Sequence, residues 1–148
     1  MSRARGAGLG SAAFALTVLL GCRSPSADSD VLRVEFGVPF GGDIQDRAQI
    51  PLGLETRELS LRVTFREPLA RDRVLSWELE RPSSARGSDG GTLFAAELGE
   101  ARVGKGERTA EAKLAFRRSD PPGPWRIHVR LDGRALLDRN FEVVDDKH

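Results

Sequence analysis

Short stretches in which apolar and polar residues alternate cover the chain from Val31 onward and predict β-strands. In the clearest one, Leu59 to Arg66, every odd-numbered residue is apolar and every even-numbered residue is polar. Because successive side chains of a strand point to opposite faces, one row faces a core and the other faces solvent. The same alternation occurs in residues 32–36, 75–79, 109–117 and 125–131. The less regular stretches 92–98 and 134–144 bring the number to about seven, and about seven strands without a dependable helix are typical of an antiparallel β-sandwich.

Turn residues separate the expected strands. Asp132-Gly133 lies between the last alternating stretch and a segment that carries Phe141 and Val143, and Asp-Gly between such runs is a strong hairpin signal. The strand over 75–79 is expected to end at Pro82, followed by a long loop over residues 83–91. Residues 109–117 also have helix-favouring Ala, Glu and Lys, but their apolar row has a period of two and favours a strand.

One apolar stretch, residues 37–54, follows neither the helical nor the strand period. It either crosses between the two sheets or forms an exposed contact loop anchored by Phe40 and Leu52. The crossing is favoured, because connections in Greek-key sandwiches commonly have this composition.

Two features resemble immunoglobulin-like and fibronectin type III-like bacterial domains. The segment from Gly123 to Gly133, followed by Phe141-Glu142-Val143, resembles their closing hairpin, and Trp77 resembles the core tryptophan of immunoglobulin-like sheets. No cysteine pair flanks that tryptophan, so the antibody-type version is excluded. The resemblance implies an all-β fold: a single antiparallel immunoglobulin-like β-sandwich over residues 31–145, with a polar tail over 146–148.

The first residues have the layout of a secretory signal. Arg3 and Arg5 are followed by an uncharged, largely apolar run that ends at Gly21. That run is too short for a membrane-spanning helix, which needs about 20 apolar residues. The chain is therefore expected to be exported.

The signal ends in Leu19-Leu20-Gly21-Cys22, which resembles the lipobox of bacterial lipoproteins. The resemblance implies cleavage between Gly21 and Cys22 and a diacylglycerol thioether on Cys22. Residues 1–21 are then the lipoprotein signal peptide, and residues 22–30 are the lipidated cysteine and a polar, flexible tether. The alternative is an ordinary signal peptide in which Cys22 merely follows a small residue. Cys22 is the only cysteine of the chain, so no disulfide forms within it.

The same resemblance predicts a location. Two or more acyl chains hold a protein on a bilayer for long times, so the protein is expected to be anchored to a bacterial membrane through Cys22. The next residue is Arg23 and not the Asp that favours retention at the inner membrane. In a cell with two membranes the resemblance therefore implies the outer one, at its periplasmic face or its surface.

Composition and charge narrow the range of functions that the sequence allows. The formal net charge is +1, which argues against nucleic acid as the main partner, because phosphate binding needs a surplus of basic residues on one face. Only two histidines are present, and neither lies in a metal-ligand spacing. Loop aspartates such as Asp89 and Asp120 are expected to form turns and not a calcium site. We expect no catalytic residues, no metal and no cofactor.

Arginines form the strongest candidate binding feature. The candidates for partner binding are Arg62, Arg66, Arg126 and Arg130, and Arg71 and Arg73 are also expected to point outward. Together they would coat one sheet face and attract lipid head groups, polysaccharide or an acidic protein. In the alternative interpretation they form a solvated face paired with Glu78 and Glu80.

The function expected from these observations is that of a membrane-anchored envelope lipoprotein. Its β-sandwich would be a non-catalytic interaction or structural module, in a complex with another envelope protein. The alternative is carbohydrate or ligand binding, for which Trp77 and Trp125 would have to form an exposed stacking platform; both are in phase with aliphatic rows, which favours core packing. An enzyme is the least expected class.

Overall fold

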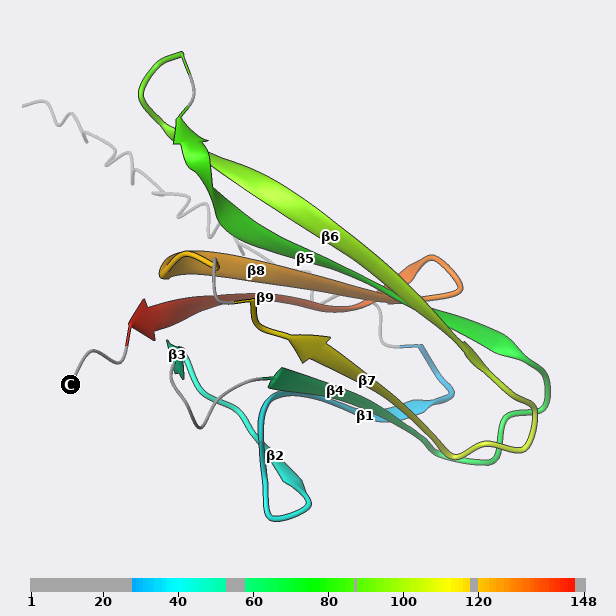
Figure 1. The fold of residues 1–148 in the computed structure, drawn as a ribbon. Helices are drawn as coiled ribbons and strands as arrows, with labels where there is room; N and C mark the ends of the chain where they lie inside the picture. The colour runs from blue at the N-terminus through cyan, green and yellow to red at the C-terminus, as the bar shows by residue number, and fades with distance from the viewer. Residues whose placement is uncertain (1–27, 53–57, 87, 118–119, 146–148) are drawn as a thin grey trace, which may run out of the picture.

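A computed structural model describes residues 28–52, 58–86, 88–117 and 120–145 of this chain, and nine strands within them form two packed sheets (Figure 1). The strands are β1 (Val31–Phe40), β2 (Asp43–Gln45), β3 (Gln49–Leu52), β4 (Glu58–Phe65), β5 (Arg73–Arg86), β6 (Thr92–Val103), β7 (Thr109–Ala115), β8 (Gly123–Leu131) and β9 (Arg134–Asp145). One sheet has the order β2-β1-β4-β7 and the other has the order β3-β9-β8-β5-β6. The all-β, immunoglobulin-like sandwich predicted from the sequence is confirmed. The expected signal peptide, Gly21, Cys22 and the tail at 146–148 lie outside the described residues.

The four-stranded sheet is built around β4. All four apolar residues of its alternating row, Leu59, Leu61, Val63 and Phe65, are buried, as predicted. The stretch 109–117 forms strand β7, and its inward residues Ala110, Ala112 and Leu114 are also buried. Strand was therefore the correct choice over helix for this stretch, because its period-two row covers one face of the core.

In β1 the expected alternation fails at its first residue. Leu32 is 57% exposed, whereas Val31 is buried. The pairing of β1 with β4 has a register shift between Val31 and Arg33, and an extra residue at such a bulge turns the side chains before it to the opposite face. The prediction that Leu32 points inward is wrong for that reason.

The five-stranded sheet contains the longest strands. All its described pairs are antiparallel except β3 with β9, which run parallel. Strand β3 lies in this sheet while β2 lies in the other, so the chain crosses between the sheets here, as predicted for the stretch 37–54. Phe40 is 67% exposed, at the end of β1, and Leu52 is half-buried against the core.

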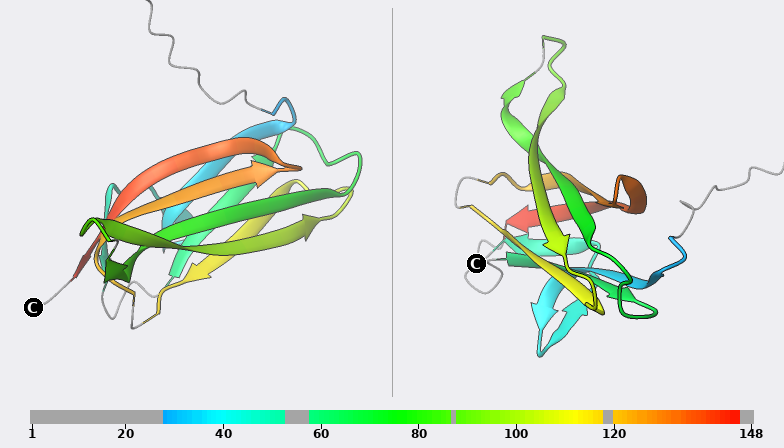
Figure 2. Two further views of the ribbon diagram at one scale, coloured as in Figure 1. Left: turned by 90° about the horizontal axis from the view of Figure 1, so that it is seen from above. Right: turned by 90° about the vertical axis from the view of Figure 1, so that its right-hand side faces the viewer.

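Strands β5 and β6 form a long ribbon that projects beyond the rest of the sandwich (Figures 1 and 2). Strand β5 continues past Pro82 to Arg86, so the loop predicted over residues 83–91 is shorter than expected. Proline is tolerated at this position because Pro82 pairs with Phe94 at the far end of the ribbon, away from the centre of the sheet. Its pairing partner, β6, extends over a similar length.

Trp125 occupies the centre of the aromatic core. It is 2% exposed, its ring meets Phe116 edge-on at 5.5 Å and lies 6.1 Å from Phe141, and its Nε1 donates to the Pro121 carbonyl oxygen at 3.1 Å. The turn between β8 and β9 has φ of 48° at Asp132 and 79° at Gly133, which is the conformation that a two-residue hairpin requires. Both features follow the prediction made from the closing segment.

The described part of the chain contains no helix long and apolar enough to cross a membrane.

Candidate functional site

Two arginines lie at the ends of the inward row of β5, and each closes one end of the core. The row runs Arg73, Leu75, Trp77, Leu79 and Arg81. Arg73 is 6% exposed and Arg81 is 8% exposed. A buried guanidinium needs paired carboxylates to offset its desolvation, and both residues have them.

Arg73 binds three carboxylates where the chain enters the domain. Its guanidinium donates to Asp28 at 2.7 Å, to Asp30 at 2.8 Å and to Asp132 at 2.5 Å. Asp28 and Asp30 precede β1, whereas Asp132 belongs to the β8–β9 turn. The arginine therefore ties the start of the domain to β5 and to the closing hairpin.

These contacts favour the charged form of the carboxylates. The hydrogen bond from Arg73 lowers the pKa of Asp28 below its ordinary value of 3.8, against the opposing effect of burial. The backbone N–H of Val74, followed by Arg73, lowers the pKa of Asp132 in the same way. The network is thus stable at neutral pH and is expected to weaken only in acid.

Arg81 forms a second network at the opposite end of β5. It donates to Asp120 at 2.6 Å and pairs with Glu97 on β6, while its guanidinium carbon lies 5.7 Å from the centre of the Trp125 ring. Arg117 reaches the same Glu97 carboxylate at 3.1 Å. One cluster of charges therefore holds the β7–β8 connection, which carries Arg117 and Asp120, to β5 and to the edge strand β6.

A cleft of about 520 Å³ lies over this cluster. It is lined by Arg81, Pro82, Ala95, Ala96, Glu97, Leu98, Arg117, Asp120 and Pro121. Its cations are already neutralised by Asp120 and Glu97, so the cleft has no surplus charge with which to hold an anionic ligand.

The outer edge of β6 is the third feature. Strand β6 is the last strand of its sheet and pairs only with β5 among the described strands. Three of its large apolar side chains are exposed: Leu93 by 45%, Phe94 by 50% and Leu98 by 76%. A long edge strand with apolar side chains is a template for pairing with another strand.

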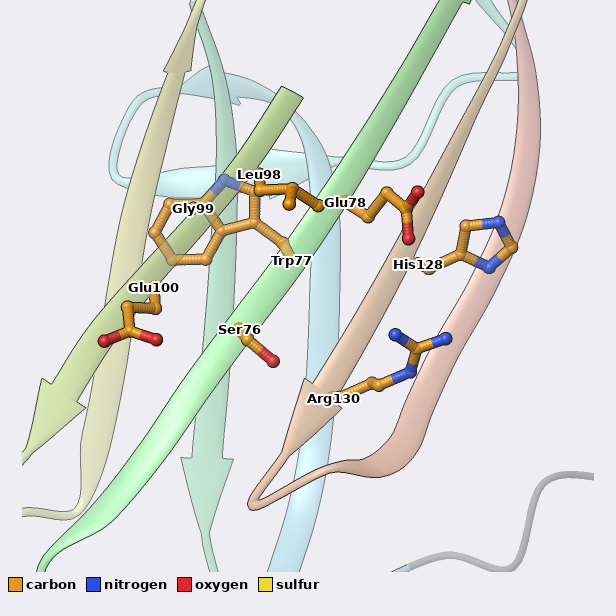
Figure 3. Close-up of a pocket in the computed structure, with 8 residues that line it drawn as sticks. All are labelled: Ser76, Trp77, Glu78, Leu98, Gly99, Glu100, His128 and Arg130. Carbon is orange, nitrogen blue, oxygen red and sulfur yellow. The ribbon is translucent and has the colours of Figure 1, made fainter. Parts of the chain in front are cut away.

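The indole of Trp77 lies across β6 at Gly99 (Figure 3). A Cβ built on Gly99 would lie 2.2 Å from Trp77 Cε2, so only glycine allows this packing. A hollow of about 290 Å³ lies where β5, β6 and β8 meet; its lining includes Trp77, Leu98, His128 and Arg130. Trp77 is half-buried against the core, which agrees with core packing more than with an open platform for sugars.

The four predicted partner-binding arginines do not share one surface. Arg62 lies on β4 and Arg66 directly follows that strand, whereas Arg126 and Arg130 lie on β8 in the other sheet. The expected single cationic face is wrong, because the sequence alternation shows which residues point outward but not from which sheet. Partner binding by either pair stays a prediction.

Two of the four candidate arginines, Arg62 and Arg126, have neighbours of opposite charge or polar character. Arg62 Nε donates to Glu111 at 2.6 Å, and Arg126 Nε donates to the Asn140 side chain at 2.8 Å. Arg126 is also opposite Glu80 in the sheet. These contacts fit the alternative interpretation of a solvated, charge-balanced face.

The remaining candidates occupy local roles. Asp120 is buried on Arg81 and accepts the Arg117 backbone N–H at 2.6 Å, and Asp89 accepts the Gly91 N–H at 3.0 Å, as turn-forming aspartates do. His128 lies 3.4 Å from Asp138 and 3.9 Å from Glu80 on the outer sheet face. Across residues 28–52, 58–86, 88–117 and 120–145, no three His, Cys, Asp or Glu side chains gather as a metal site.

Two features were missed by the sequence reasoning. Arg73 was expected to point outward, but it has the same parity as Leu75 and Leu79 and therefore points into the core, as does Arg81. Continuing the alternation of Leu75 and Leu79 in both directions reaches Arg73 and Arg81, and would have identified both as inward-pointing. The exposed apolar residues of β6 occur at both odd and even positions, so no alternation of apolar and polar residues pointed to them.

The comparisons with known proteins agree on the fold. No family model and no curated protein matches the sequence. Among solved structures, the chain is similar to an immunoglobulin-like protein from Pseudomonas aeruginosa, with a TM-score of 0.52 and 20% identity over 78% of this chain and 94% of that one. The soluble domain of PmoD from Methylocystis sp. matches with a TM-score of 0.40 and 17% identity over 78% of this chain and 97% of that one, a likeness too distant to carry an argument. The chain therefore has an immunoglobulin-like β-sandwich fold.

Proposed function

We propose that this chain is an exported lipoprotein, anchored to a bacterial membrane by lipid on Cys22, whose β-sandwich is a non-catalytic protein-interaction module. The observation that carries the interaction role is the outer edge of β6, where Leu93, Phe94 and Leu98 are exposed on a strand edge that no other described strand pairs with. Backbone hydrogen bonds along such an edge supply affinity, and the alternate side chains supply specificity.

Two observations support the anchoring part of the proposal. The Leu19-Leu20-Gly21-Cys22 segment resembles a lipobox and contains the only cysteine of the chain. The domain begins close behind it, because Asp28 is already buried and paired with Arg73 at 2.7 Å. A lipid on Cys22 would therefore hold the β-sandwich close to the bilayer surface.

Mass spectrometry of the membrane-bound protein tests the anchor. The amino-terminal peptide is expected to begin at Cys22 and to carry a diacylglycerol thioether. In the Cys22→Ala variant the protein is expected to leave the membrane fraction or to remain as the uncleaved precursor. An unmodified Cys22 thiol in the wild-type protein would overturn the anchoring part.

Crosslinking in intact envelopes, followed by purification and mass spectrometry, tests the interaction part. A protein crosslinked to the wild type is expected to be lost from Leu98→Lys, because a lysine on the edge disfavours strand pairing. The matched control is Leu32→Lys, which changes a leucine that is 57% exposed on the other sheet. Equal recovery of the crosslinked protein with both variants would contradict an interaction at β6 and would favour a ligand such as polysaccharide.

A further inference from the structure

We infer that β6 pairs with β6 of a second copy of this chain, in an antiparallel register centred on Ala96. This inference deepens the proposed interaction function and rests on it. The two five-stranded sheets would then join edge to edge into one continuous sheet. The order of side chains along β6, and the face of the sheet that each one occupies, favour this register.

The outward face of β6 is symmetric about Ala96. Phe94 and Leu98 each lie two residues from Ala96, on the same face of the sheet, and both are exposed. A two-fold axis perpendicular to the sheet at Ala96 places Phe94 opposite Leu98 of the second copy, and Leu98 opposite its Phe94. Aromatic and aliphatic side chains in directly opposed positions stabilise a strand pair.

The inward face tolerates the same register. Leu93 falls opposite Gly99, over which the apolar ring of Trp77 lies, and Ala95 falls opposite Glu97. The Glu97 carboxylate is already bound by Arg81 and Arg117, so the seam receives no uncompensated charge. All three exposed apolar residues of β6 are covered in this arrangement.

Neighbouring registers are less favourable. Centring the pair on Glu97 places two carboxylates directly opposite each other, which is destabilising. Centring it on Leu98 places Phe94 opposite Arg102 and leaves the aromatic ring without an apolar partner. The Ala96 register pairs residues 92–100 of each copy, a range that includes the end of the ribbon that projects from the sandwich (Figure 2).

The other sheet edges are poorly suited to self-pairing. Strand β7 has outward Glu111 and Lys113, and the edge strands β2 and β3 are only 3 and 4 residues long. Charged or very short edges are common protections against strand addition. A single long apolar edge that pairs with itself closes at a dimer and does not extend into a filament.

Cysteine crosslinking tests the register in the full chain with Cys22→Ala, where the introduced cysteine is the only thiol. Directly opposed Cα atoms lie about 4.5–5.5 Å apart, within disulfide reach. Ala96→Cys is therefore expected to form a disulfide-linked dimer under mild oxidation. Leu98→Cys alone is the matched control, because two copies of residue 98 would be displaced by four residues, about 13 Å, along the strands. A mixture of Phe94→Cys and Leu98→Cys chains is expected to crosslink.

Sedimentation of the same background gives a second measurement. A dimer is expected, with Leu98→Lys shifting it to monomer and Leu32→Lys leaving it unchanged. A monomer at all concentrations, or equal crosslinking through Ala96→Cys and Leu98→Cys, would overturn the inference. If the envelope crosslink of the proposed function still depended on Leu98 in that case, the interaction function would survive with a different protein on β6.

Discussion

The edge strands β6 and β7 follow one another in the chain, yet they present opposite kinds of surface. Strand β7 has 7 residues, and its outward Glu111 and Lys113 pair with Arg62 at 2.6 Å and Glu58 at 3.0 Å. Strand β6 has 12 residues, and its outward row includes Phe94, Ala96 and Leu98. Charges on an edge oppose pairing with another strand, so β7 is protected and β6 is open. This difference between the two edges is the basis for the interaction proposed at β6.

The largest fall in the free energy of unfolding is expected from Arg81→Met, which removes contacts at the edge strand β6. The substitution leaves the Asp120 carboxylate, 4% exposed, without its guanidinium, and it removes one of the two arginines that bind Glu97 of β6. Removing one partner of a buried pair costs about 3–5 kcal/mol, so the free energy of unfolding in urea should fall by that order. The control is Arg102→Met, whose pair with Asp72 is exposed to solvent, so the free energy of unfolding is expected to fall much less. Equal losses would contradict a structural role for the Arg81 cluster.

A smaller fall in the free energy of unfolding is expected from Gly99→Ala in β6. The added Cβ collides with the Trp77 ring, and overpacking of this kind costs about 1–3 kcal/mol. The near-ultraviolet circular dichroism of tryptophan should change together with the unfolding midpoint. Gly104→Ala serves as the control, because the nearest side-chain atom to its Cβ would be 3.9 Å away. If both variants unfolded alike, the proposed close packing of Trp77 on Gly99 would be wrong.

Acid is expected to weaken the domain gradually, without changing the apolar row of β6. Asp28 and Asp132 have a lower pKa in the folded protein than their ordinary value, so their stabilisation is complete above about pH 4. It is lost as the pH falls through the lower folded-state pKa values. Urea midpoints measured from pH 7 to pH 2 should therefore fall below about pH 4. The Asp28→Asn variant should be less stable at pH 7 and should lose less in acid; an unchanged acid slope would argue against this role for Asp28.

The smallest effect on stability is expected from removing the charges of β7. Glu111→Leu with Lys113→Leu removes two exposed ion pairs, so the free energy of unfolding is expected to change little. In the Leu98→Lys background, where β6 is blocked, this double change should create new self-association that sedimentation detects. Lys105→Leu with Glu107→Leu, in the turn before β7, is the control and should remain monomeric. Absence of new association would show that charge is not what protects β7.

The sequence was a good guide to single strands and a poor one to their assembly. Leu59, Leu61, Val63 and Phe65 could be assigned to the core because one strand with a strict period of two determines its own buried face. Leu32 could not be assigned correctly, because the bulge that exposes it depends on how β1 pairs with β4.

The positions of the arginines show the same difference between what a single strand determines and what the assembly of strands determines. Arg62 and Arg126 were predicted to point outward, and they do, but only the sheet order places them on opposite sides of the sandwich. Arg73 and Arg81 look like ordinary surface residues in the sequence. Their burial becomes favourable only because Asp28, Asp132 and Asp120, which are 39 to 59 residues away, fold back onto them.

The sequence by itself determined the all-β class, the inward row of β4, the core position of Trp125 and the Asp132-Gly133 hairpin, because each depends on short-range alternation or turn chemistry. It also carried the lipobox-like segment at Cys22, which is local in the chain. The tertiary structure decided which strands are edges, which arginines are buried and which apolar residues of β6 are exposed. These properties depend on pairing between distant strands, since an identical row of side chains is core in a central strand and open surface at an edge.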